Sequence, residues 1–422
     1  MRRTDRNGRL ARLVRPNEYH RLGEQAHGEQ YAYDLLGRLQ EVTRPDGALQ
    51  AIHTYNAWGY LASATDACGS GIRFTYDIGG RRTRAMTSAG SAQQYEYDAA
   101  GNITGVMDGE AHRTGYELDE WGRIVEIKRP DGGSEFYRYD YAGNITGAVD
   151  GEGNTTRYEY GANGQLLRMT DPLGNAEEYH YDSGNRLSRM TDRNGTETTY
   201  TYNLYGSLTG RRAQNPEVPG TKLSEAYEYT PEGLLKSAIS SGSAPGAPNV
   251  YTMGMRYSYE YDAMGRLTKK SASGRTLLFF AYDLNGNLIR QEDVTGKVTE
   301  YSYNELDILE SVNDNGNILA KYTYYPDGAI RSLQSGSLYT EYAYDADKNL
   351  ASLKTLLGDE VLADNHYTYD HNGNRTEKQQ SGGNTRYTYD GLNQLTRVEY
   401  PGYTAGYRQE WRRAISTTLR TT

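Results

Sequence analysis

A nine-residue unit that recurs along the whole chain limits most strongly what this sequence can fold into. The clearest copy is Tyr-Glu-Tyr-Asp-Ala-Met-Gly-Arg-Leu at residues 259–267, and seventeen copies are present in the 422 residues. Most copies follow one another at 21 residues, and a fixed period of this size predicts a repeat architecture. The second aromatic position falls at Tyr33, Tyr55, Tyr76, Tyr97, Leu118, Tyr139, Tyr160, Tyr181, Tyr202, Tyr229, Tyr261, Tyr282, Tyr303, Tyr324, Tyr344, Tyr369 and Tyr389.

The residue types within one unit predict a β-hairpin closed by a type I turn. In the copy at residues 31–39, Asp34 is expected at the first turn position, where its carboxylate can accept backbone N–H groups. Gly37 is expected to take the positive φ that follows such a turn. Tyr33 then lies opposite Leu39, and aromatic-on-aliphatic pairs across strands stabilise a sheet.

Substitutions at two positions of the unit agree with this interpretation, with a few exceptions. The Gly37 position is Gly in thirteen copies, and the others are Asn185, Asp307, Lys348 and Asn393. Gly, Asn and Asp tolerate positive φ, so Lys348 alone does not fit. The Leu39 position is Leu or Ile in fifteen copies, with Arg82 and Arg375 as exceptions. The hairpin is therefore predicted for every copy.

Composition indicates that the apolar surface is spread along a sheet. Leu, Ile, Val and Phe make up about 15% of the chain, a level that by itself would indicate disorder. The 41 tyrosines contradict disorder because most occupy the two periodic aromatic positions. The net charge of −9 is mild, and charges of both signs are interspersed, so no nucleic-acid groove is predicted. An arginine cluster in the first fifteen residues is interpreted as a solvated or fragmentary end.

A second turn signal lies between successive units, for example Arg-Pro-Asp-Gly at residues 44–47 and Asp-Pro-Leu-Gly-Asn at 171–175. Turns thus fall about every ten residues, which predicts an antiparallel meander with two strands per repeat. A propeller is disfavoured because its blades need about 40 residues, and a parallel β-helix fits the two turns per period less well. Insertions near residues 214–220, 240–255 and 357–365 are expected to be loops on one rim of the sheet.

Three regions are expected along the chain. Residues 1–28 are an incomplete leading repeat, for which an internal start and a degenerate capping repeat are both open. Residues 29–400 form the repeat region. Residues 401–422 lack the pattern and are expected to be a degenerate or truncated tail.

The Tyr-x-Tyr-Asp-x-x-Gly-Arg/Asn-Leu units resemble the YD-repeat, or rearrangement-hotspot (Rhs), family over roughly residues 31–400. That family includes bacterial Rhs polymorphic toxins, cocoon subunits of insecticidal toxin complexes, wall-associated proteins and the teneurins. The resemblance implies an all-β fold in which antiparallel β-hairpin repeats of about 21 residues wind into a spiral strip, here a partial YD-repeat shell. In bacterial members the shell holds a C-terminal toxin, and paired Asp-Pro-x-Gly motifs cleave the toxin off. The Asp-Pro-Leu-Gly at residues 171–174 stands alone and is interpreted as a turn.

No enzyme and no cofactor are predicted. Nearly every Asp occupies a turn position, and the seven histidines show no metal-ligand spacing. Cys68 is the only cysteine, so no intrachain disulfide can form. No apolar run reaches the 18 residues of a membrane span, and no secretory signal is present. Localisation of this chain is left open, while the parent is expected to be secreted or at the cell surface.

The expected function is structural, as a shell segment of a bacterial Rhs-type protein whose toxin lies outside this chain. The expected partners are further repeats or a core region of a longer parent, with a toxin domain or a cell-surface glycan as further candidates. The alternative is an adhesion module that binds carbohydrate or wall polymer through its aromatic strip. No catalytic or metal residue is assigned, and the structural repeat positions chosen are Tyr31, Tyr33, Asp34, Gly37, Leu39, Tyr97, Asp98, Gly101, Tyr139, Asp140, Gly143, Tyr261, Asp262, Gly265, Leu267, Tyr282, Asp283, Gly286, Tyr369, Asp370 and Gly373.

Overall fold

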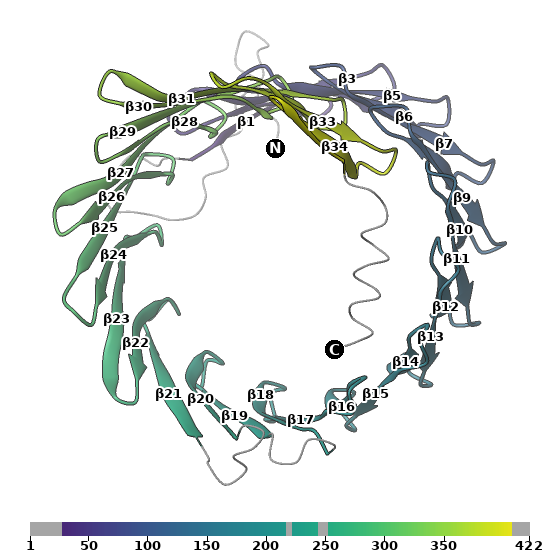
Figure 1. The fold of residues 1–422 in the computed structure, drawn as a ribbon, viewed down its shortest axis with the longest axis vertical. Helices are drawn as coiled ribbons and strands as arrows, with labels where there is room; N and C mark the ends of the chain where they lie inside the picture. The colour runs from purple at the N-terminus through teal and green to yellow at the C-terminus, as the bar shows by residue number, and fades with distance from the viewer. Residues whose placement is uncertain (1–27, 217–221, 244–251, 407–422) are drawn as a thin grey trace. The chain divides into compact units, whose positions relative to one another are not determined.

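The computed structural model describes residues 28–216, 222–243 and 252–406, and all of its regular elements are strands. It contains 35 strands in one sheet, and consecutive strands pair antiparallel, hairpin after hairpin (Figure 1). The predicted all-β fold of hairpin repeats is confirmed. Residues 1–27 and 407–422, most of the predicted leading repeat and tail, lie outside the described residues.

The strands follow the repeat. Odd-numbered strands are β1 (Gln30–Tyr33), β3 (Leu49–Tyr55), β5 (Gly71–Tyr76), β7 (Ala92–Tyr97), β9 (Arg113–Leu118), β11 (Ser134–Tyr139), β13 (Thr155–Tyr160), β15 (Ala176–Tyr181), β17 (Glu197–Tyr202), β19 (Lys222–Tyr229), β21 (Thr252–Tyr261), β23 (Arg275–Tyr282), β25 (Val298–Tyr303), β27 (Asn317–Tyr324), β29 (Leu338–Tyr344), β31 (Glu360–Tyr369), β33 (Thr385–Tyr389) and β35 (Tyr403–Gly406). Even-numbered strands are β2 (Leu39–Thr43), β4 (Leu61–Asp66), β6 (Arg82–Thr87), β8 (Ile103–Met107), β10 (Ile124–Lys128), β12 (Ile145–Val149), β14 (Leu166–Thr170), β16 (Leu187–Thr191), β18 (Leu208–Gln214), β20 (Leu235–Ser243), β22 (Leu267–Ala272), β24 (Leu288–Asp293), β26 (Leu309–Asp314), β28 (Ile330–Ser335), β30 (Leu350–Leu357), β32 (Arg375–Gln379) and β34 (Leu395–Tyr400).

Each odd strand from β1 to β33 ends at the second aromatic position, and the even strand after it begins at the Leu39 position. We call the turn between them the primary turn and the turn that leads to the next repeat the secondary turn. The sequence did not reveal a bulge in each hairpin. In the first hairpin Ala32 pairs with Glu41 and Tyr33 with Leu39, which leaves Gln40 without a partner in the register. The same shift recurs in the other hairpins whose register is described.

Two expectations about irregular regions are wrong. Residues 357–365 are not a loop, because the insertion lengthens β30 and β31 and leaves only Gly358 and Asp359 between them. The other two insertions also lengthen strands β18 to β21, while residues 217–221 and 244–251 lie outside the described residues. The pattern does not stop at residue 400 either. β35 pairs with β34 from Tyr400↔Tyr403 to Arg397↔Gly406 and adds one strand.

The chain divides into two units. Unit 1 comprises Met1–Glu117, Lys128–Gly132 and Ser302–Thr422, and unit 2 comprises Leu118–Ile127 and Gly133–Tyr301. Few side chains in either unit are buried. In the described residues the buried apolar side chains are Val42, Ala85, Ala272 and Val398, and no large side chain is fully buried. Along strands such as β13, half-buried and exposed positions alternate, with the tyrosines on the less exposed face. The predicted spread of apolar surface along the sheet is observed.

Candidate functional site

The primary turn is organised by its aspartate. Asp34 Oδ1 accepts the backbone N–H groups of Leu36 and Arg38, both at 2.9 Å, and the turn is closed by Gly37 N donating to Asp34 O at 2.9 Å. The backbone bond from Arg38, with the Arg38 guanidinium next to it, lowers the pKa of Asp34. The carboxylate therefore acts as an anionic acceptor that fixes the loop, as the residue types predicted.

The residue at the Gly37 position has positive φ in all seventeen primary turns. Gly37 has φ +79°, and the non-glycine residues there lie between +57° and +66°. Lys348 is included, at +66°, although a lysine gains nothing locally from this conformation. The secondary turns also use positive φ, for example at Gly47 and Gly174.

The arginine that follows the positive-φ residue joins one hairpin to the next. Arg266 Nε donates to Asp262 Oδ2 at 2.7 Å within its own turn, and its Nη1 donates to the Asp283 carbonyl oxygen at 2.8 Å in the next turn. Its guanidinium also lies 4.9 Å from the ring centre of Tyr282. The same combination of contacts is made by Arg81, Arg123 and Arg186.

Where asparagine replaces this arginine, the contact to the turn aspartate is kept. Asn287 Nδ2 donates to Asp283 Oδ2 at 2.9 Å. Equivalent bonds are made by Asn102, Asn144, Asn349 and Asn374. Asn374 also reaches the next primary turn, because its Nδ2 donates to Asn393 Oδ1 at 2.8 Å.

The second tyrosine carries a contact that sequence reasoning missed. Tyr282 donates its hydroxyl to the main-chain oxygen of Leu267, at 2.8 Å, across the strand pair formed with the preceding repeat. The same bond to the first residue of the preceding even strand is made by Tyr55, Tyr76, Tyr97, Tyr139, Tyr181, Tyr202, Tyr229, Tyr261, Tyr324, Tyr369 and Tyr389. The signal was present, because sixteen copies have Tyr at this position and none has Phe.

The two arginines at the Leu39 position stack on aromatic rings instead of packing as aliphatic side chains. The Arg82 guanidinium lies 4.4 Å from the ring centre of Phe74, on the strand paired with it. Arg375 lies 5.2 Å from Tyr367 and 5.4 Å from Tyr387, so it bridges two repeats. Both arginines thus keep a contact with an aromatic neighbour, which explains why they are tolerated.

Within unit 1, secondary turns of early repeats contact primary turns of late repeats. Arg44 Nη1 donates to the Pro326 carbonyl oxygen at 2.6 Å. Further along, Asn372 Nδ2 donates to Asp108 Oδ2 at 2.8 Å. We call this row of contacts the turn seam. Within unit 1, these contacts join early repeats to late repeats.

Histidine and lysine side chains contribute to the turn seam. The His371 backbone N–H donates to Oε1 of Glu110, which lies in an early secondary turn, at 2.7 Å. The same oxygen lies 3.0 Å from His371 Nδ1. The Lys348 ammonium lies 2.5 Å from Asp66 Oδ2 and 3.2 Å from Asp327 Oδ2. The hydrogen bond to Asp66, followed by that to Asp327, raises the pKa of Lys348. Lys348, the misfit of the sequence pattern, is thus a cation held between two carboxylates.

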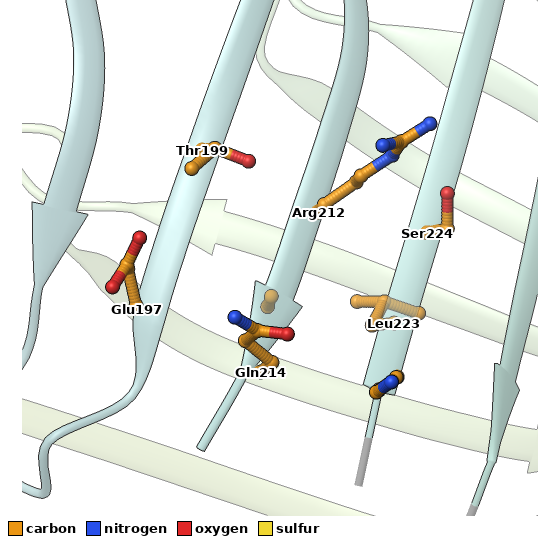
Figure 2. Close-up of a pocket in the computed structure, with 8 residues that line it drawn as sticks. Glu197, Thr199, Arg212, Gln214, Leu223 and Ser224 are labelled. Carbon is orange, nitrogen blue, oxygen red and sulfur yellow. The ribbon is translucent and has the colours of Figure 1, made fainter. Parts of the chain in front are cut away.

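Surface hollows in the described residues include one in unit 2 and one in unit 1. A hollow of about 520 Å³ lies over β17, β18 and β19, where Glu197, Arg212 and Lys222 give it mixed charge (Figure 2). No aromatic side chain lines it. A second hollow of about 300 Å³ lies at the turn seam between Cys68 and Lys348, with Tyr325 and Tyr344 on its wall. Neither hollow gathers the groups of a catalytic site.

The titratable side chains are dispersed. Among the described residues, no three His, Cys, Asp or Glu side chains gather in a way that could hold a metal ion. Asp171 accepts backbone N–H groups of Leu173 and Asn175 at 2.9 Å, so Asp-Pro-Leu-Gly is a turn in this chain. Cys68 is a free, exposed thiol. No helix with the length and apolarity of a membrane span is found in the part of the chain that the structure describes.

Comparison with known proteins agrees with this geometry. The family described as RHS Repeat matches residues 97–134, 139–176, 282–329 and 369–405. These four stretches are RHS repeats. The third and fourth matches include the primary turns at residues 325–328 and 370–373 of the turn seam, and the last reaches into β35.

Curated relatives match a short part of the chain. The tRNA nuclease WapA of Bacillus subtilis is 30% identical over 142 residues, which are 32% of this chain and 6% of that protein. A tRNA3(Ser)-specific nuclease WapA of Bacillus spizizenii matches to the same extent. The chain therefore spans only about 6% of the length of the curated relatives it matches.

Solved structures match most of the chain in fold. The structure of TcdB2-TccC3 has a TM-score of 0.73 at 16% identity and covers 88% of this chain and 24% of that chain. A Photorhabdus luminescens Tc holotoxin pore has a TM-score of 0.68 at 16% identity and covers 88% of this chain and 23% of that chain. At this identity the likeness shows the fold alone. The RHS repeats here thus fold like a segment of a Tc toxin component.

Proposed function

We propose that this chain is a structural wall segment of a YD-repeat shell, within a longer bacterial protein that is secreted or exposed at the cell surface. The single observation that carries the proposal is the contact system that repeats from hairpin to hairpin. An Asp-fixed turn, an arginine that reaches the next turn and a tyrosine hydroxyl bonded to the preceding repeat recur along the strip. Such a system stabilises a continuous wall.

The single-layered sheet supports the proposed role as a wall segment. A single sheet with almost no fully buried side chains cannot be stabilised by a thick core, so its contacts must lie within the sheet and between neighbouring hairpins. The tyrosine and arginine contacts supply this in-plane stabilisation. We therefore propose that the structural repeat positions, including Asp98, Asp140 and Asp370, stabilise the wall.

We further propose that the parent uses this wall to enclose a C-terminal toxin that lies outside the chain. The likeness in fold to TcdB2-TccC3 and the match to proteins named tRNA nuclease WapA support this view. The matched part is 6% of the WapA length, so we assign nuclease chemistry to no residue of this chain. The chain itself is proposed to be non-catalytic.

The test uses the parent protein. We expect its gene to continue into further repeats, a core region and a toxin, with an immunity gene next to it. In limited proteolysis of the purified parent, the toxin segment should survive conditions that degrade the same toxin produced alone. A parent in which Arg266 and Tyr282 are replaced by alanine should lose that protection. Equal cleavage of enclosed and isolated toxin would overturn the proposal.

The adhesion alternative has weaker support. Sugar binding by aromatic stacking needs exposed ring faces at a concave site, but the larger hollow has no aromatic lining. A glycan array and a cell-wall pull-down with the folded chain test it directly. Binding above background that Tyr325→Ala and Tyr344→Ala abolish, at the hollow beside Lys348, would favour adhesion.

A further inference from the structure

The hollow of about 520 Å³ lies within unit 2, over the adjacent strands β17, β18 and β19 (Figure 2). This volume falls in the range of about 300 to 1,000 Å³ that small-molecule sites occupy in proteins. Polar side chains line the hollow on all three strands, and Ala213 and Leu223 complete the lining. The size and polarity of the hollow therefore fit a hydrophilic small molecule.

The register of the strands places the polar lining on one face of the sheet. Thr199 pairs with Arg212, and Arg212 pairs with Ser224. In the neighbouring row Gln214 pairs with Lys222. Arg212 and Lys222 are therefore diagonal neighbours on adjacent strands, and such neighbours lie about 7 to 8 Å apart. A guanidinium and an ammonium at this separation can both reach one anion placed between them.

The two cations of the hollow are not neutralised by the chain itself. Among the residues that the structure describes, neither the Arg212 guanidinium nor the Lys222 ammonium has a hydrogen-bond or ion-pair partner. Arg211, on the opposite face of the same strand, differs, because its Nε lies 2.8 Å from Glu225 Oε2. Two like charges at close range repel each other, and an anion between them is attracted by both.

An unpaired cation alone does not distinguish this place on the sheet. Arg157 on β13 is exposed on the same face and also lacks a carboxylate partner in the described part of the chain. It does not line either of the two hollows. The combination of two unpaired cations with a hollow therefore distinguishes the region over β18 and β19.

The carboxylate of the hollow lies away from the two cations. Among the described residues that line the hollow, Glu197 is the one carboxylate. Figure 2 shows Glu197 on β17, while the Arg212 side chain extends from β18 toward Ser224 on β19. Glu197 Oε1 also lies 3.9 Å from Nη1 of Arg189, on the strand before the hollow. The hollow therefore has a cationic side at β18 and β19 and a side with a hydrogen-bond acceptor at β17.

We propose that this hollow binds a small phosphate monoester whose remainder carries hydroxyl groups. A phosphate monoester has a charge of about −1.5 to −2 at pH 7, which matches the two unpaired cations, whereas a carboxylate would leave one of them unpaired. The phosphate oxygens accept hydrogen bonds from the Arg212 guanidinium, the Lys222 ammonium and the Ser224 hydroxyl. On the other side of β18, the Glu197 carboxylate and the Thr199 hydroxyl bind the hydroxyl groups of the remainder.

Isothermal titration calorimetry of the whole chain with three probes tests the ligand class. Glucose 6-phosphate has both the phosphate monoester and the hydroxyl groups, glucuronate replaces the phosphate by a carboxylate, and inorganic phosphate lacks the hydroxyl-bearing remainder. Glucose 6-phosphate should bind most tightly. Glucuronate should bind at least about tenfold more weakly, because one charge-assisted hydrogen bond is lost, and inorganic phosphate should also bind more weakly.

Three variants test the site. Arg212→Gln and Lys222→Gln each remove one cation of the hollow. Arg157→Gln is the matched control, because it removes an exposed, unpaired cation of the same face outside the hollow. Each hollow variant should weaken the binding of glucose 6-phosphate by about tenfold or more, and the control should bind it as the unmodified chain does. Circular dichroism shows whether each variant folds.

Three results would overturn the proposal. The first is an unmodified chain that does not bind glucose 6-phosphate. The second is glucuronate or inorganic phosphate binding as tightly as glucose 6-phosphate. The third is a loss of affinity in Arg157→Gln as large as that in Arg212→Gln, which would show attraction to the general charge of the sheet. None of these results affects the proposed wall function, which is tested by protection of the toxin segment.

Discussion

The Lys348 ammonium lies 2.5 Å from Asp66 Oδ2, although the two residues belong to opposite ends of the repeat array. Asp327, from the primary turn of the preceding repeat, approaches the same ammonium at 3.2 Å. Lysine occupies the positive-φ position there at φ +66°, where thirteen other repeats use glycine. The contact between distant repeats therefore offsets the backbone strain at this turn.

Lys348→Gly should separate the effect of backbone strain at residue 348 on stability from the effect of its ion pairs in the turn seam. Left-handed backbone costs a lysine about 1 to 2 kcal/mol, while partly exposed ion pairs contribute about 0 to 1 kcal/mol each. We expect the free energy of unfolding to change by less than about 1 kcal/mol, because these terms offset each other. Hydrogen exchange at the His371 backbone amide, which Glu110 holds across the seam, should become faster.

Gly286→Lys is the matched control for this prediction. It places lysine at the same turn position, at φ +98°, with open space for its Cβ. Without a carboxylate pair to compensate, it should cost about 1 to 2 kcal/mol of unfolding free energy. Unchanged exchange at His371 in Lys348→Gly would show that Lys348 does not hold the seam.

Tyr282→Phe should destabilise the chain although it removes only a hydroxyl. The Leu267 carbonyl oxygen loses its partner at 2.8 Å, which costs about 0.5 to 1.5 kcal/mol. Tyr259→Phe, at the first tyrosine position of a neighbouring repeat, removes a hydroxyl for which no bond is described and should be nearly neutral. Chemical denaturation of both variants gives the comparison. Equal stability losses would contradict the assigned role of the second tyrosine.

Replacement of the turn asparagines by glycine should have different effects at two equivalent positions. Asn185→Gly, at φ +62°, should be neutral or mildly stabilising, because glycine holds this conformation without strain. Asn393→Gly should be destabilising by about 1 kcal/mol. Its side-chain oxygen accepts bonds from Asn372 at 2.9 Å and Asn374 at 2.8 Å in the neighbouring repeat.

Gly265→Val makes the opposite change, from glycine to a β-branched residue, at the same turn position. Its thermal unfolding is compared with that of Asn185→Gly and Asn393→Gly. A β-branched residue at φ +79° should be the most destabilising of the three changes. If all three variants unfold at the same temperature, the positive-φ position does not control the stability of the hairpin.

Stability should fall at both ends of the pH scale. Hydrogen bonds from the Arg266 backbone and side chain lower the pKa of Asp262, and bonds of the same kind lower the pKa of Asp182. Because their folded pKa values lie below about 3.9, the unfolded value, these aspartates stabilise the fold fully above that pH. The contribution is lost as the pH falls below it. Asp262→Asn should reduce the slope of melting temperature against pH in this acidic range.

The loss of stability at alkaline pH is expected to come from ionisation of tyrosine. Burial, followed by the hydrogen bond to Glu177, raises the pKa of Tyr179 to about 12. A raised folded pKa stabilises the protein fully below the unfolded value of about 10 and loses that contribution as the pH rises toward 12. Tyr179→Phe should flatten the loss of stability between these values. An unchanged alkaline profile would contradict the assignment.

The sequence by itself determined the hairpin, because every interaction that specifies it lies within nine residues. Asp34 accepts N–H groups two and four positions ahead, and Gly37 takes the φ that only a few residues tolerate. Such local requirements appear directly as residue types at fixed spacing. The pairing of Tyr33 with Leu39 followed from the turn for the same reason.

Only the tertiary structure decided what joins one repeat to another. The bond from Tyr282 to Leu267 depends on the register between neighbouring repeats, which the unit itself does not encode. The interpretation of residues 357–365 as a loop failed because an insertion can lengthen two paired strands as readily as a turn. Lys348 did not fit the repeat pattern in the sequence. Its two carboxylate partners come from other turns, one of them distant in the sequence, so the pattern of one unit could not reveal them. A local pattern records the conformation that a residue adopts, whereas its partners are set by which other repeats lie beside it.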